Sequence, residues 1–115
     1  MTALGQHILL ELYDCPPDLL ARPATSERIL TAAATAMAAT IIEARFHAFN
    51  PHGVSGVIVI AESHLTIHTW PEHGYAAVDI FSCGDLRLED GIQLLLREFR
   101  AGRSARRDVP RGIIG

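Results

Sequence analysis

The chain has 115 residues, of which 49% are hydrophobic and 20% are charged, and its formal net charge at pH 7 is −3. This length predicts a single domain, residues 1–115, whose small core would gain from burial against a second copy. The charge is nearly balanced, and nothing in it indicates the basic patch of a protein that binds nucleic acid or an anionic membrane. We therefore expect neither nucleic acid nor a membrane as a partner.

The N-terminal region predicts one strand, residues 8–13, which ends at a turn where two prolines follow Cys15. It has neither the basic nor the apolar region of a secretion signal, and no apolar run in the chain reaches the ~20 residues needed to cross a bilayer. We therefore expect a cytoplasmic protein. In that reducing compartment Cys15 and Cys83 should remain free thiols.

The first helix is predicted to follow an N-cap at Thr25 or Ser26. Its apolar positions recur at helical spacing, and they are Ile29, Leu30, Ala33 and Met37. Residues 39–49 alternate loosely, and after a turn a further strand is expected at residues 54–61. The centre of that strand has no polar face, so it must be covered on both sides. A helix layer can cover one face, and the sheet of a second copy can cover the other, which predicts a homodimer.

Two more strands are predicted at residues 65–70 and 75–83, joined by a turn that contains Pro71 and Gly74. Asp85 is expected to cap a second helix, which Gly102 follows as a stop signal. The apolar stripe of that helix consists of Leu88, Ile92, Leu95, Leu96 and Phe99. Residues 104–109 are a candidate edge strand. These elements predict an α+β fold, a two-layer α/β sandwich with an antiparallel sheet and two main helices.

The chain contains no lysine: all ten of its positively charged side chains are arginines. A pyridoxal-phosphate enzyme holds its cofactor as a Schiff base with a lysine. This chain cannot do so. If it decarboxylates an amino acid, its electron sink must come from elsewhere, and a pyruvoyl group is the remaining familiar choice.

Residues 61–72 read Ala-Glu-Ser-His-Leu-Thr-Ile-His-Thr-Trp-Pro-Glu, and this segment resembles the self-cleavage site of the small prokaryotic S-adenosylmethionine decarboxylase proenzymes. Matching short motifs occur at residues 5–7, 46–49, 51–56, 74–79 and 83–84. The resemblance implies that the chain breaks its own Glu62–Ser63 bond, which leaves a β chain of residues 1–62 and an α chain of residues 63–115. It implies that Ser63 becomes a pyruvoyl group. It also implies that two protomers stack into a four-layer αββα sandwich.

Self-cleavage requires the Ser63 hydroxyl to reach the carbonyl of Glu62 in an N-to-O acyl shift, which needs a strained turn. The resulting ester breaks by β-elimination to dehydroalanine, which hydrolyses to pyruvoyl and ammonia. A base must remove the Cα proton of Ser63, and histidine suits this task near neutral pH. Correspondence with the family points to His68 as that base and to the Ser55 hydroxyl as the group that holds the carbonyl or ester oxygen. An isolated histidine or turn serine would more often have a structural role.

The resemblance also implies roles in decarboxylation, where the substrate amine forms a Schiff base with the pyruvoyl group. Cys83 resembles the family's donor of a proton to the substrate Cα, although a free cysteine is often simply buried. Phe49 aligns with an aromatic residue that stacks on adenine, and Glu72 aligns with a carboxylate that binds the ribose hydroxyls. Core packing and solvation are the ordinary alternatives for these two side chains. Trp70 could belong to the core or to the wall of the pocket.

No metal site is expected, because His64 and His68, four positions apart on one strand, would lie ~13 Å apart at ~3.3 Å per residue, and no short-spaced Cys or His pair anchors such a site. The resemblance implies a small-molecule substrate, S-adenosylmethionine, whose decarboxylation gives the aminopropyl donor for spermidine. Two alternatives stay open. One is a pyruvoyl-dependent arginine or ornithine decarboxylase on the same fold, and the other is a dimeric binding module that does not cleave itself.

Overall fold

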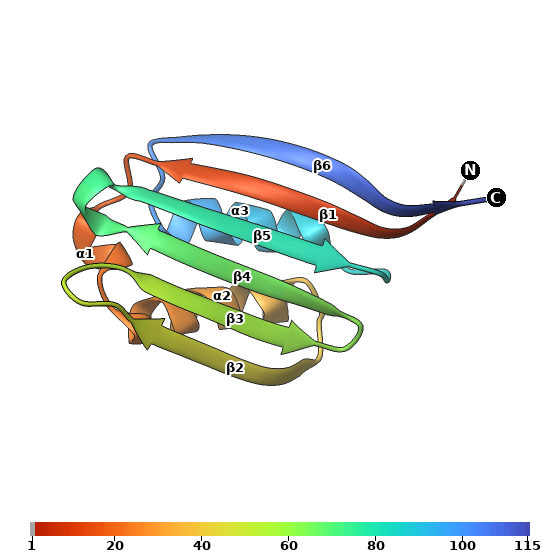
Figure 1. Cartoon of the computed structure of the whole chain (residues 1–115), viewed down its shortest axis with the longest axis horizontal. Helices are drawn as coiled ribbons and strands as arrows, with labels where there is room; N and C mark the ends of the chain where they lie inside the picture. Colours follow the sequence, from red (N-terminus) through yellow and green to blue (C-terminus); the bar gives the residue numbers. More distant parts are fainter. Residues whose placement is uncertain (1) are drawn as a thin grey trace.

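Six strands form one antiparallel sheet in the computed structural model, which describes residues 2–115 (Figure 1). The strands are β1 (Thr2–Tyr13), β2 (Ile41–Ala48), β3 (Val54–Ile60), β4 (Ser63–Trp70), β5 (Tyr75–Ser82) and β6 (Arg103–Ile114). Their order across the sheet is β2-β3-β4-β5-β1-β6. The N-terminal strand β1 is therefore an inner strand, paired with β5 on one side and with β6 on the other.

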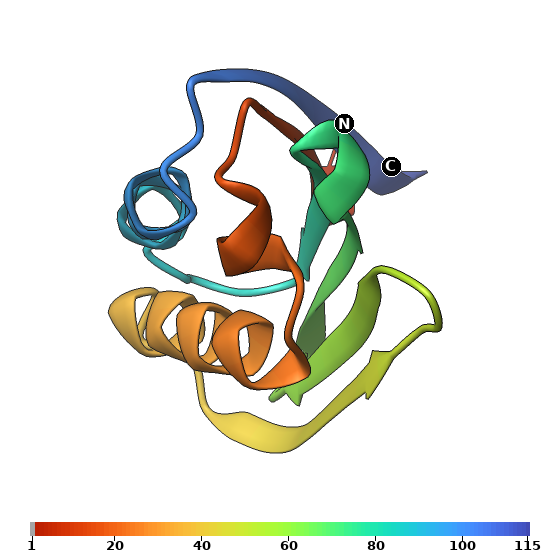
Figure 2. The same ribbon diagram turned by 90° about the vertical axis from the view of Figure 1, so that its left-hand side faces the viewer.

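Two main helices, α2 (Pro23–Ala36) and α3 (Leu88–Glu98), lie side by side on one face of the sheet (Figure 2). A single-turn helix, α1 (Pro17–Leu20), connects β1 to α2, and a 3-10 turn, η1 (Pro71–His73), connects β4 to β5. None of the residues 2–115 covers the opposite face, which we call the open face. The predicted α+β fold, with one antiparallel sheet and two main helices, is confirmed. No helix in this part of the chain is long and apolar enough to cross a membrane.

The core lies between the sheet and the two helices. Alternate residues of the central strands point into it, and they include Ile8, Leu10, Leu12, Leu65, Ile67, Val78 and Ile80. The helices contribute Ile29, Leu30 and Ala33 from α2 and Ile92, Leu95 and Phe99 from α3. Burial of such apolar surface is the main stabilising contribution to a domain of this size. The intervening strand residues point to the open face, and one of them, Val59 in the apolar strand β3, remains 39% exposed.

The predicted helix starts are wrong by two to four residues. Helix α2 begins at Pro23, since proline suits the first helical position and Arg22 is extended before it, so Ser26 lies buried within the helix. Helix α3 begins at Leu88 after Arg87, and no side chain caps it, so the expected cap at Asp85 is not used. Both corrections reflect the weak energy of a cap, about 1 kcal/mol, compared with the tertiary packing of the helix.

The edge strand is longer than expected, since β6 runs from Arg103 to Ile114 and includes Pro110. Proline is tolerated there because β6 pairs with a neighbour on one side only. The turn predicted around Pro16 contains the additional helix α1, whose first position is again a proline. Proline is thus compatible with regular structure in an edge strand and at the first position of a helix.

Candidate active site

Ser63 is the first residue of β4 and follows a two-residue turn from β3. Glu62 in that turn has a φ of 66°, in the left-handed region that residues other than glycine adopt only at a cost. This backbone places the Ser63 hydroxyl, as donor, 2.5 Å from the carbonyl oxygen of Glu62. The hydroxyl of Ser63, the residue expected from the sequence to be the nucleophile, thus lies beside the Glu62 carbonyl oxygen, in a turn with left-handed backbone at Glu62.

Cys83 lies beside Ser63, at the end of the neighbouring strand β5. Its backbone N–H donates to the Ser63 Oγ at 3.1 Å, and its side chain is exposed. Cys15 is different, because it is buried in the core and desolvation, assisted by the charge of Asp14, raises the pKa of its thiol to about 11. Of the two cysteines, Cys83 is the one whose backbone contacts Ser63. We refer to Glu62 and Ser63, together with the adjacent Cys83 that follows β5, as the turn end of the β3–β4 hairpin.

Ser55 and His68 form a pair across β3 and β4, with the Ser55 Oγ 2.7 Å from the His68 Nδ1. They are directly opposite in the strand register, on the open face, and we call this pair the base end of the hairpin. His68 is five positions along β4 from Ser63, which is ~16 Å at ~3.3 Å per residue. The structure therefore brings Ser55 and His68 together, but it does not bring either of them to Ser63 of the same chain.

The residues expected to bind the substrate lie toward the base end. Phe49 is 52% exposed in the turn between β2 and β3, and its ring contacts that of His47 with 4.9 Å between centroids. Glu72 lies in η1 and lines a shallow depression of about 440 Å³ together with His52. Trp70, whose role the sequence left open, is 42% exposed and tilted against a neighbouring tyrosine. In Figure 1 the β2–β3 turn and the β4–β5 connection are at the left, and the β3–β4 turn is at the right.

Thr69 holds the base end in place and was not recognised from the sequence. Its Oγ1 accepts from the N–H of Val54 at 2.9 Å and donates to the carbonyl of Leu20 at 2.8 Å, and both bonds are buried. Because Val54 precedes Ser55 and Thr69 follows His68, these bonds fix the register of the Ser55–His68 pair. A threonine in a strand is too common for its sequence to reveal such a role.

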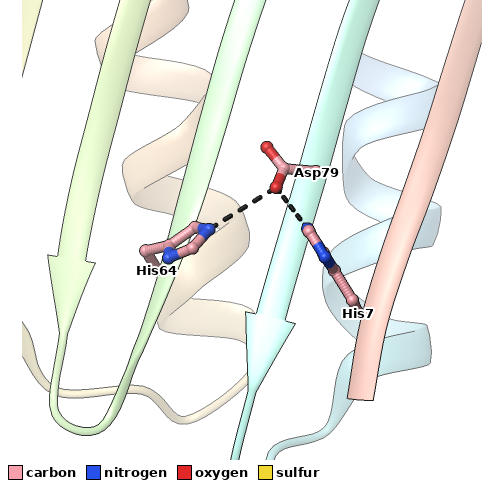
Figure 3. Close-up of side chains that lie close together, drawn as sticks. All are labelled: His7, His64 and Asp79. Atoms are coloured by element: carbon pink, nitrogen blue, oxygen red, sulfur yellow. Dashed lines mark hydrogen bonds and ion pairs between the residues drawn. The ribbon is translucent and has the colours of Figure 1, made fainter. Parts of the chain in front are cut away.

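A second polar cluster on the open face was also missed. His7 of β1, His64 of β4 and Asp79 of β5 point toward one another (Figure 3), with Nε2 of each histidine near the Asp79 Oδ2, at 2.5 Å and 3.4 Å respectively. His7 and Asp79 belong to motifs that resemble the family, but no role followed from them. These side chains come from three adjacent strands, and 72 sequence positions separate His7 from Asp79, so no local spacing could have revealed the cluster.

Comparisons with known proteins agree with one another. The model of a protein family described as S-adenosylmethionine decarboxylase matches residues 6–112. A protein from Caldanaerobacter subterraneus subsp. tengcongensis, named S-adenosylmethionine decarboxylase proenzyme, is 51% identical over 114 residues, which cover 98% of this chain and 92% of the relative. A protein of the same name from Thermodesulfovibrio yellowstonii is 50% identical over 115 residues, which cover 99% of this chain and 85% of the relative.

A solved structure is similar over the whole chain. The crystal structure of the adenosylmethionine decarboxylase from Aquifex aeolicus VF5 matches with a TM-score of 0.93 and 34% sequence identity, covering 100% of this chain and 96% of that chain. The arrangement of strands and helices described above is thus shared with that enzyme from end to end.

Proposed function

The chain belongs to the S-adenosylmethionine decarboxylase family, and on that premise we propose that it breaks its own Glu62–Ser63 bond and then decarboxylates S-adenosylmethionine at the new N-terminus. The product serves in this family as the aminopropyl donor for spermidine. The observation that carries the proposal is the position of the Ser63 hydroxyl, 2.5 Å from the Glu62 carbonyl oxygen in a turn with left-handed backbone. This arrangement suits the acyl shift that starts self-cleavage.

Cleavage proceeds in three chemical steps. The Ser63 Oγ attacks the Glu62 carbonyl carbon, and the peptide C–N bond breaks to leave an ester and a free amine. Removal of the Ser63 Cα proton then expels the Glu62 carboxylate from Cβ, which leaves dehydroalanine. Water hydrolyses the imine tautomer of this residue to a pyruvoyl group and ammonia. The N–H of Cys83 already donates to the Ser63 Oγ, so it can hold that oxygen in place for the attack.

The base for the second step comes from another copy of the chain. Within one chain His68 is ~16 Å from Ser63, too far for proton transfer without a large rearrangement. In a two-fold dimer each contact occurs twice, so stacking two open faces can place the base end of one copy against the turn end of the other. Uncovered apolar residues of β3 on the open face, including Val59, support this pairing. The result is the four-layer αββα sandwich expected from the family.

Residues at both ends of the hairpin take part in decarboxylation. A pyruvoyl group formed from Ser63 would supply the electron sink for the loss of carbon dioxide. Cys83 returns a proton to the Cα of the substrate. Phe49 stacks on the adenine, and Glu72 binds the ribose hydroxyls. Because Phe49 and Glu72 lie toward the base end, the copy that supplies His68 also supplies the nucleoside pocket.

The alternatives considered from the sequence have less support. The relatives reported above carry the name of S-adenosylmethionine decarboxylase, which favours this substrate over arginine and ornithine. A binding module that does not cleave would have no use for a hydroxyl held against a strained peptide carbonyl.

Intact mass measurement of the purified protein, with a denaturing gel, tests the proposed cleavage. We expect fragments of residues 1–62 and 63–115, the second without a free N-terminal amine and lighter by one ammonia than a fragment that begins with serine. Ser63→Ala should remain a single chain. A plain serine N-terminus would indicate ordinary proteolysis, and an uncut wild-type chain would favour the binding module. Release of labelled carbon dioxide from S-adenosylmethionine, compared with arginine and ornithine, tests the substrate.

A further inference from the structure

We propose that His7, His64 and Asp79 form a binding site for a divalent transition metal of the zinc type on the open face of the sheet (Figure 3). The three ligand atoms, one from each side chain, lie within 4.8 Å of one another. Two imidazole nitrogens and one carboxylate oxygen are a common protein donor set for Zn²⁺, Co²⁺ and Ni²⁺. Mg²⁺ prefers oxygen ligands and is not expected to bind there.

The strand register, more than any single rotamer, brings the three ligands together. His7 of β1 and His64 of β4 are both paired with Phe81 of β5, one on each side of it. Their rings contact the Phe81 ring, with centroids 5.5 Å and 5.8 Å away respectively. Asp79 is two residues from Phe81 on the same face, so it is the diagonal neighbour of both histidines. Three hydrogen-bonded strands therefore fix the position of the site.

The carboxylate is oriented as a metal ligand requires. Thr66, paired with Asp79 in the register, donates its hydroxyl hydrogen to the Asp79 Oδ1. This leaves Oδ2 directed at both imidazoles. Hydrogen bonds of this kind to the second oxygen of a ligating carboxylate are typical of protein metal sites. The three side chains are half-buried in the single chain, so the fourth ligand would be water or, in the proposed dimer, a group of the copy that stacks on the open face.

Arg111 of β6 opposes metal binding and provides a sharp test. Its Nη1 is 3.0 Å from the His7 Nδ1, and because a guanidinium can only donate, Nδ1 must accept. In the metal-free protein the His7 Nε2 therefore carries the hydrogen that it donates to Asp79. A metal at Nε2 requires that hydrogen to move to Nδ1, and Arg111 must then withdraw. A side chain at position 111 that can accept a hydrogen bond from the His7 Nδ1–H should therefore favour metal binding.

Zinc titration of the metal-free, tag-free full-length protein tests the site. We expect one Zn²⁺ per chain, no competition from millimolar Mg²⁺, and visible absorption from bound Co²⁺ of the intensity typical of tetrahedral sites. His64→Gln and Asp79→Asn should each weaken Zn²⁺ binding at least tenfold, whereas Arg111→Gln should strengthen it several-fold. The matched control His52→Gln, a histidine in the β2–β3 turn outside the cluster, should leave affinity unchanged.

The same titration on Ser63→Ala separates this inference from the proposed cleavage, because that variant should bind zinc as the wild type does. Circular dichroism of each variant verifies that the fold is intact. The inference is overturned if the folded wild-type chain does not bind Zn²⁺. It is equally overturned if His64→Gln binds Zn²⁺ as tightly as the wild type.

Discussion

The two ends of the β3–β4 hairpin differ in what they can do alone. At the turn end, the Ser63 hydroxyl lies against the carbonyl oxygen of Glu62, and the backbone N–H of Cys83 donates to the Ser63 oxygen. At the base end, Ser55 and His68 are hydrogen-bonded to each other but face no bond of their own chain that requires a base. A hairpin of regular strands is too stiff to fold one end onto the other. On the proposed mechanism, one chain thus carries both groups of residues that cleavage needs, at opposite ends of the hairpin.

Complementation between two inactive variants is the strongest test of whether the two ends act together across a dimer. Ser63→Ala cannot form the ester, and His68→Ala should stall at the ester, from which hydroxylamine releases the fragments. When both variants are co-produced with distinguishable tags, the His68→Ala chain should be cleaved, because the Ser63→Ala chain supplies its histidine. Gel analysis of each tagged chain measures this outcome.

The control for complementation is His64→Ala, on the same strand and face, which should be cleaved nearly normally on its own. If mixed dimers form and the His68→Ala chain still remains at the ester, the base must act within one chain. The hairpin would then have to rearrange before cleavage.

Cys83→Ala should separate cleavage from turnover at the turn end. Its backbone N–H remains, so cleavage should proceed, but loss of the proton donor should lower turnover by about 10²–10⁴-fold, the usual contribution of general acid catalysis. Some cycles should place the proton on the pyruvoyl carbon and leave alanine at the N-terminus of the α chain, which mass spectrometry detects. Cys15→Ala should retain turnover. Normal turnover of Cys83→Ala would assign the proton donor to another group.

Substrate binding at the base end is expected to depend on Phe49. Phe49→Ala should lower kcat/KM for S-adenosylmethionine by a factor that corresponds to about 1–3 kcal/mol of lost transition-state binding, the range for stacking a base on an aromatic ring. Glu72→Gln should mainly raise KM. Cleavage should be unaffected in both variants, since neither side chain touches the reacting bond. Steady-state kinetics after complete cleavage provide the measurement. If both variants keep the wild-type kcat/KM, the nucleoside binds elsewhere.

The smallest expected effect concerns Thr69, which supports the base end without taking part in the chemistry. Thr69→Val removes two buried hydrogen bonds, and we expect a loss of about 1–2 kcal/mol in the free energy of unfolding. Urea unfolding in the Ser63→Ala background measures this value on an uncut chain. Thr69→Ser keeps the hydroxyl and should recover most of the loss. If Thr69→Val and Thr69→Ser were equally stable, the two hydrogen bonds would not hold the strands in register.

Much of the fold could be predicted because apolar periodicity follows the core. Strand β4 and helix α3 have clear periods of two and 3.6 residues, and both were placed within a few residues. Strand β6 was only partly predicted, since its exposed, arginine-rich sequence resembles a loop and its pairing with β1 is what makes it a strand. The predicted N-caps, Thr25 or Ser26 for the first helix and Asp85 for the second, were wrong because local preference is weaker than packing.

The part of the candidate site that consists of adjacent residues could be predicted from the sequence, whereas contacts between residues on different strands could not. The turn chemistry of Glu62 and Ser63 is contained in adjacent residues, and the structure places them as expected. The five positions between Ser63 and His68 looked short in the sequence, but in an extended strand they become a separation of ~16 Å. The cluster around Asp79 depends on which strands are neighbours, and periodicity does not encode that order.

The strand order has a consequence for the stability of the chain after the proposed cleavage. Residues 1–62 hold β1, β2 and β3, and residues 63–115 hold β4, β5 and β6, so the two pieces interlace across the sheet and share three ladders, β3–β4, β5–β1 and β1–β6. Breaking the Glu62–Ser63 bond should therefore not release either fragment from the fold. It does turn unfolding from a one-body into a two-body process, so the melting temperature of the mature enzyme should rise with protein concentration. The intact chain can fold as one molecule. After cleavage, fragments 1–62 and 63–115 that separate on unfolding must meet again by diffusion before they can refold.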